Sequence, residues 1–139
     1  MSERRCVLAR PSQRELARQE EHRRFAALVE AAHREGLIRV FTRFALVDAE
    51  RPEGWRVNPL SNGSIGGEVC GFAWIVVKGN TRFGRWAKKH CGWGEKGGPA
   101  INFVALFGQS QRRKETYAVA YAEVLRNAGI EAEVVSRID

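Results

Sequence analysis

Several features that define common protein classes are missing from this chain of 139 residues. No apolar run approaches the roughly 20 residues that a membrane-spanning helix needs, so we expect no membrane contact. The first ten residues hold only the short apolar stretch 7–9, which is not the core of a secretory signal peptide. The three cysteines follow no disulfide spacing, which favours a reducing cytoplasm.

Motifs that identify a catalytic or ligand-binding site are missing as well. The sequence contains no C-x-x-C or H-x-x-x-H spacing for a metal and no G-x-x-x-x-G-K-[ST] loop for a nucleotide. The position of Ser110 is more typical of a helix cap than of a nucleophile. Cys91, beside His90, is more simply interpreted as a thiol without a chemical role. We therefore predict no catalytic residue, no metal and no cofactor, and favour a protein without enzymatic activity.

Acidic side chains are scarce in the middle of the chain. Residues 54–114 hold 10 basic side chains but only Glu68 and Glu95, a net charge of +8, whereas residues 1–53 carry +2 and residues 115–139 carry −3. The same central segment holds all four tryptophans and 12 of the 14 glycines. A local excess of positive charge attracts an anionic partner more strongly than the same charge spread evenly.

The hydrophobic pattern predicts a single α+β domain with the order α-β-β-α-β-α-β and a four-stranded mixed sheet with helices packed on it. A helix over 12–35 begins with a capping box of Ser12 and Glu15 and ends at Gly36. Alternating patterns at 37–47 and 130–138 predict edge strands, and fully apolar runs at 69–78 and 100–107 predict central strands. Helices follow at 81–90 and 110–127, and residues 48–67 form a long loop.

Two strand-to-helix turns carry cations where helices normally favour acidic side chains. A bound phosphate would meet both the helix amides and these cations, so we expect anion binding there. If the two strands are neighbours, both turns lie at one edge of the sheet and share one site. The candidates are Lys78, Arg82, Arg85, Lys88 and Lys89 at the first turn and Arg112, Arg113 and Lys114 at the second.

Aromatic side chains among cations are typical of proteins that bind single-stranded nucleic acid. On the predicted strand 37–47, Arg39, Phe41 and Arg43 share one face. Trp55 and Trp93 fall in predicted loops and are the better stacking candidates, whereas Trp74 and Trp86 are expected in the core.

The leading hypothesis is therefore a small basic protein that binds nucleic acid, with single strands as one candidate form, and catalyses no reaction. One alternative is an interaction or inhibitor protein that docks on an acidic partner surface. The other is a small enzyme acting on a phosphorylated metabolite. The polar first half of the N-terminal helix offers a contact surface for a second copy of the chain.

Overall fold

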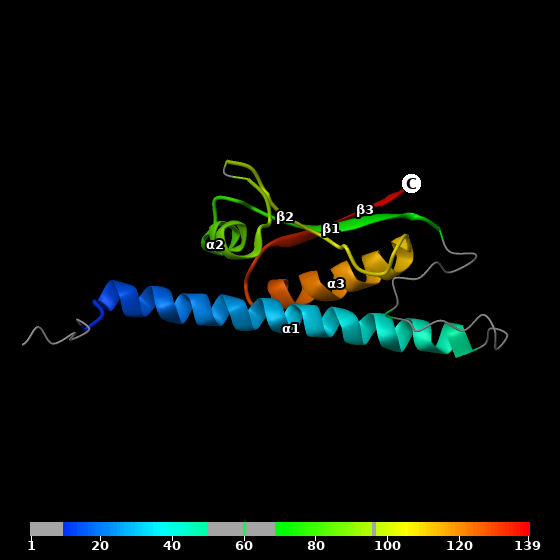
Figure 1. The fold of residues 1–139 in the computed structure, drawn as a ribbon, viewed down its shortest axis with the longest axis horizontal. Coiled ribbons are helices and arrows are strands. Elements are labelled where there is room, and N and C mark those ends of the chain that lie inside the picture. Colours follow the sequence, from blue (N-terminus) through cyan, green and yellow to red (C-terminus); the bar gives the residue numbers. More distant parts are fainter. Residues whose placement is uncertain (1–9, 50–59, 61–68, 96) are drawn as a thin grey trace, which may run out of the picture.

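The computed structural model describes residues 10–49, 60, 69–95 and 97–139. Three helices and three strands alternate along the chain. Figure 1 shows the sheet as one layer, α3 packed beneath it and the long helix α1 running beneath α3, with α2 at one end of the sheet. Their bounds are α1 Gln13–Ala49, β1 Gly71–Val77, α2 Arg82–Cys91, β2 Ala100–Phe103, α3 Gln111–Asn127 and β3 Ala132–Ile138.

The sheet has the order β2-β1-β3, and both neighbours of β1 are antiparallel to it. Trp74 in β1 lies opposite Phe103 on one side and Val135 on the other. The α+β class is confirmed, but the four-stranded mixed sheet is wrong. The strand predicted at 100–107 is shorter than expected and lies at an edge, so only the strand at 69–78 is central.

The missing strand is the one predicted at 37–47, because these residues continue α1. Val40 and Phe44 are buried one helical turn apart, whereas Ile38 is 50% exposed. Gly36 does not end the helix. A Cβ atom there would lie 2.5 Å from Cδ2 of Tyr117, so the glycine allows close contact between α1 and α3.

The helix ends follow the local signals in the sequence. Ser12 and Glu15 exchange side-chain to backbone hydrogen bonds of 3.2 and 3.3 Å, which is the predicted capping box. Thr81 caps α2 by accepting from the Gly84 amide, and Ser110 caps α3 by accepting from the Arg113 amide. These caps fix where both helices begin. Of the predicted loop at 48–67, residues 48 and 49 belong to α1, and the rest lies outside the described residues except Leu60.

The core lies between α1, α3 and one face of the sheet. Ala73, Ile75 and Val77 point from β1 toward α3 and are almost completely buried. The alternate residues of β1 point to the opposite face, which no described helix covers, so the expectation of a strand covered on both faces is wrong. None of the described helices has the length and apolar character needed to cross a membrane.

Candidate functional site

The two cationic turns lie at opposite ends of the sheet. The first turn follows Val77 at the end of β1. The second turn pairs with the start of β1, where the Gly71 amide donates to the Gln109 carbonyl at 2.9 Å and the Gln111 amide donates to the Val69 carbonyl at 3.0 Å. A strand the length of β1 spans about 20 Å. The two turns therefore do not share one anion, and the expected common edge is wrong because the strands are antiparallel.

Two of the three cations at the second turn are buried inside the protein. Arg113 is completely buried, and its guanidinium carbon lies 4.9 Å from the centre of the Phe44 ring. Lys114 is 6% exposed and donates to the Gly71 carbonyl at 3.4 Å. These charges stabilise contacts between α1, α3 and β1. Arg112 alone of the three is exposed to solvent.

At the first turn, two cations form ion pairs with carboxylates distant in the sequence. Lys78 Nζ lies 3.1 Å from Glu131, and Arg82 donates to Glu21 at 2.9 Å. Both pairs sit beside a hollow of about 950 Å³ between α1 and the end of β1, whose inner wall is apolar. Since these charges are neutralised locally, this hollow is a weak candidate for binding an anion.

The remaining cations of α2 face a second hollow, which we call the cationic cleft. It has a volume of about 710 Å³ and lies between α2, the turn after β1 and the glycine-rich loop that follows α2. Its lining contains three cations and no carboxylate among the described residues. The lining residues are Gly79, Asn80, Arg85, Lys88, Lys89, Gly94, Gly97 and Gly98.

Glycines give the cationic cleft its shape. At Gly79 a Cβ atom would overlap the Gly98 carbonyl oxygen and the Lys88 ammonium, so this position requires glycine. In the facing loop, Gly94 and Gly97 have φ angles of +130° and +94°. Residues other than glycine rarely adopt such positive φ angles. The cleft wall is therefore largely bare backbone, which lets a ligand approach closely.

The charges of the cationic cleft are held by neutral groups. Arg85 donates to the Asn80 carbonyl at 2.9 Å, and Lys88 donates to the Gly98 carbonyl. Carbonyl oxygens orient these side chains without cancelling their charge. None of Arg85, Lys88 and Lys89 forms an ion pair with a carboxylate of the described residues. Among the described residues, the lining of the cleft therefore carries an excess of positive charge.

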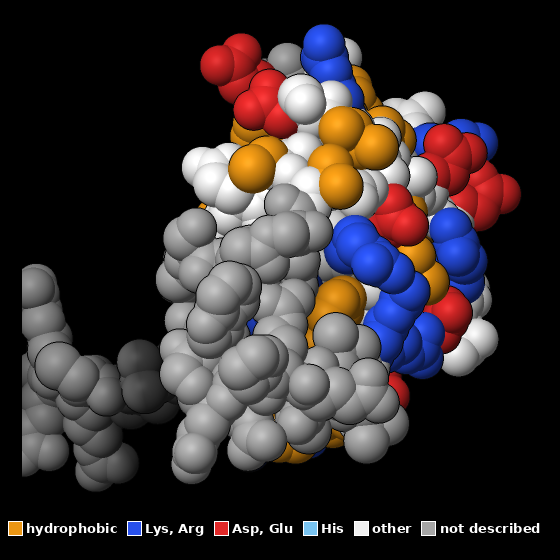
Figure 2. All heavy atoms as spheres, turned by 90° about the vertical axis from the view of Figure 1, so that its right-hand side faces the viewer, with side chains coloured by type: hydrophobic (Ala, Val, Ile, Leu, Met, Phe, Trp, Pro, Cys, Tyr) orange, Lys and Arg blue, Asp and Glu red, His pale blue; other side chains and the backbone are white. Residues whose placement is uncertain are grey.

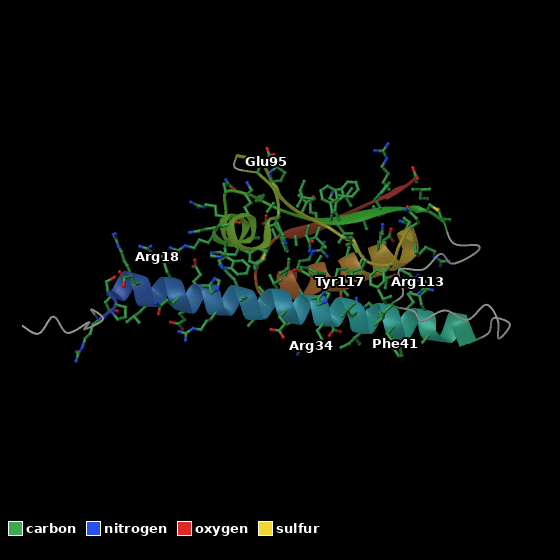
Figure 3. The ribbon with its side chains drawn as sticks, viewed as in Figure 1. Arg18, Arg34, Phe41, Glu95, Arg113 and Tyr117 are labelled. Atoms are coloured by element: carbon green, nitrogen blue, oxygen red, sulfur yellow. The ribbon has the colours of Figure 1, made fainter. Side chains whose placement is uncertain are left out.

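A third hollow, which we call the helix groove, adjoins the cationic cleft at Lys89. It has a volume of about 480 Å³ and lies between α2 and the first half of α1. Arg18 belongs to it, near the N-terminal end of α1 (Figure 3). The lining residues are Arg18, Gln19, His22, Arg23, Lys89 and His90.

Two histidines and Trp86 join the walls of the helix groove. The Trp86 indole donates to Nδ1 of His22 at 3.0 Å, and the rings of His22 and His90 lie 4.7 Å apart. Loss of hydration, with smaller contributions from His22 and Lys89, lowers the pKa of His90. A lowered pKa favours the neutral form of His90, whereas Arg18, Arg23 and Lys89 bring positive charge to the groove.

The candidates predicted on a strand at 37–47 lie on α1 instead. Arg39 pairs with Glu123 at 2.7 Å, and Arg43 donates to Thr116 at 3.0 Å, both across the contact with α3. Phe41 is 52% exposed and, like Arg34, points away from α3 (Figure 3). These residues are separated from the cationic cleft, so the combination of aromatics and cations on a strand face was wrong.

The tryptophans differ from expectation as well. Trp93 is 5% exposed and packs against Phe83, so it does not offer a free ring, and Trp55 lies outside the described residues. Trp74, expected in the core, is instead half-buried on the uncovered face of the sheet, beside Phe103. Sequence patterns missed this face because both faces of β1 are apolar.

The thiol and metal chemistry considered from the sequence gains no support. Burial raises the pKa of Cys91, which keeps the thiol protonated at neutral pH and makes it a poor nucleophile. No group of three or more His, Cys, Asp or Glu side chains that could hold a metal ion occurs within the described ranges.

Comparisons with protein-family models, with curated proteins and with solved structures found no match for this chain. A functional assignment therefore depends on the residues and the geometry described above.

Proposed function

We propose that this protein binds nucleic acid, with backbone phosphates in the cationic cleft and in the adjoining helix groove. The observation that supports this most is that Arg85, Lys88 and Lys89 form no ion pair with a described carboxylate and surround a wall of glycine backbone. Phosphate oxygens would accept hydrogen bonds from these side chains, and such charge-assisted bonds are stronger than those to neutral carbonyls.

The length of the basic surface favours a polymer over a small phosphorylated molecule. Lys89 lines both hollows, so the cations of the cleft continue into those of the helix groove, where Arg18 and Arg23 lie. A single phosphate would engage only part of this surface. A nucleic acid strand presents phosphates in series and fits five successive cations.

The test compares two double variants that lose the same charge. Arg85→Gln with Lys89→Gln removes two cleft cations, and Arg34→Gln with Arg39→Gln removes two α1 cations that pair with Glu30 and Glu123. Fluorescence anisotropy with a labelled 20-nucleotide oligonucleotide measures the affinity of each. We expect a loss on the order of tenfold for the cleft variant and less than about twofold for the control.

Polyglutamate of the same length serves as a second probe. Because the proposal rests on phosphate binding, the oligonucleotide should bind much more tightly than polyglutamate. Equal affinity for the two polymers would favour an acidic protein surface as the partner. Equal losses in both double variants would show that net charge, rather than the cleft, determines binding.

A further inference from the structure

The uncovered face of the sheet, here called the open sheet face, is unusually apolar. Phe103 is 64% exposed, Phe72 45% and Val135 37%. Figure 2, viewed from the right-hand side of Figure 1, shows hydrophobic side chains gathered near the top of the molecule, where the sheet lies. The residues that the register places on this face are Phe72, Trp74, Val76, Ile101, Phe103 and Val135, together with the charged Glu133 and Arg137.

The register brings the aromatic side chains together. Trp74 occupies the centre of the face, opposite Phe103 in β2 and Val135 in β3. The rings of Trp74 and Phe103 have centroids 5.6 Å apart and planes tilted by 42°. Phe72 lies two residues before Trp74 on the same strand and therefore on the same face. Contiguous apolar surface of this kind usually marks a binding site.

Positive charge borders this surface at both ends. At one end, the exposed Arg137 lies opposite Phe72 on β3. At the other end, β1 leads directly into the turn that contains Gly79. Gly79 lies five positions after Trp74, so at most about 18 Å of chain connect the aromatic surface with the cationic cleft.

From this arrangement we propose that the open sheet face stacks the unpaired bases of a single-stranded nucleic acid whose phosphates lie in the cationic cleft. The proposal rests on the proposed function and narrows its substrate to single strands. Bases in a duplex stack on one another and expose only their edges, whereas unpaired bases can lie flat on aromatic rings. An aromatic surface next to a phosphate site combines both contacts that a single strand requires.

One carboxylate opposes this binding mode and provides a test that does not damage the fold. Glu133 lies opposite Val76 on the open sheet face, near the end that leads to the cleft. Its charge repels a phosphate backbone that crosses from the cleft to Trp74. Glu133→Gln should therefore tighten binding of a 20-nucleotide single strand about twofold, with a smaller effect on a duplex of the same length.

The main experiment measures anisotropy of labelled (dT)20 and of a 20-base-pair duplex with the full chain. Phe103→Ala should weaken (dT)20 binding about tenfold, because one base stack is lost, and leave duplex binding unchanged. Phe41→Ala is the matched control, since Phe41 is also largely exposed, at 52% against 64% for Phe103, but lies on α1. It should change neither affinity.

The outcomes separate this proposal from the one on which it rests. If the cleft variant Arg85→Gln with Lys89→Gln loses affinity while Phe103→Ala binds (dT)20 normally, stacking is wrong and phosphate binding stands. If the wild type binds neither probe, both proposals fail. If Phe103→Ala instead converts a dimer to a monomer in sedimentation without changing (dT)20 affinity, the face joins two copies and the stacking proposal is overturned.

Discussion

Replacing Phe44 by alanine should destabilise the protein far more than replacing Ile38. Phe44 is 4% exposed and packs between α1 and α3, with the Arg113 guanidinium over its ring. Removing such a buried ring costs about 3–5 kcal/mol. The loss of the cation–π contact acts in the same direction, because Arg113 remains buried without the ring that it faces.

Ile38 provides the matched comparison because it lies on the same helix but is 50% exposed. The substitution Ile38→Ala removes the apolar contacts of the buried part of the side chain. It also stabilises the helix by a few tenths of a kcal/mol, because alanine has a higher helix propensity than isoleucine. We expect the free energy of unfolding to change by less than about 1 kcal/mol. On a β-strand, by contrast, Ile38 and Phe44 would lie on one face and both would be buried.

Urea denaturation followed by circular dichroism measures both variants. The expected result is a large fall in the urea midpoint for Phe44→Ala and a midpoint close to wild type for Ile38→Ala. Equal losses in the two variants would refute the helix through residues 37–47 and restore the strand that the alternating pattern predicts.

Three further predictions concern the cationic cleft and its surroundings. Gly79→Ala should weaken oligonucleotide affinity, because the added Cβ displaces Lys88 and the Gly98 carbonyl from the cleft wall; unchanged affinity in an anisotropy titration would contradict this role. Because the folded-state pKa of His90 is lowered, its contribution to stability is present above about pH 6.5 and is lost as the pH falls. His90→Gln should therefore show a smaller drop in Tm between pH 8 and pH 5 than the wild type, and an equal drop would be contrary to expectation. Cys91 should react with iodoacetamide at pH 7 no faster than free cysteine, since its pKa is raised, and a faster rate would reveal an activated thiol.

Features that depend on neighbouring residues were predictable from the sequence. The capping residues Ser12, Thr81 and Ser110 each mark the start of a helix. In each case the side-chain hydroxyl accepts a hydrogen bond from the backbone amide three residues later. The central strand, α2 and α3 were predicted on similar grounds. Even the first cationic turn was located correctly, since glycine and cations are adjacent in the chain.

Features that depend on distant residues were not predictable. The sequence alone suggests a helix end at Gly36, because the packing partner of this glycine, Tyr117, lies 81 positions further along the chain. The ion pair between Arg82 and Glu21 likewise joins residues that lie 61 positions apart. The sequence therefore does not show which cations are neutralised by a carboxylate. The relative direction of β1 and β2, which separates the two turns, has no local signal.

Salt dependence of oligonucleotide binding tests the central proposal most directly. Among the described residues, five cations line the cleft and the groove, namely Arg18, Arg23, Arg85, Lys88 and Lys89. If each neutralises one phosphate of a single strand, log K should fall with log salt with a slope of about −3.5 for the wild type. Removing two of these cations in Arg85→Gln with Lys89→Gln should reduce the slope to about −2.1. A slope near zero, or the same slope in both proteins, would contradict phosphate binding in the cationic cleft.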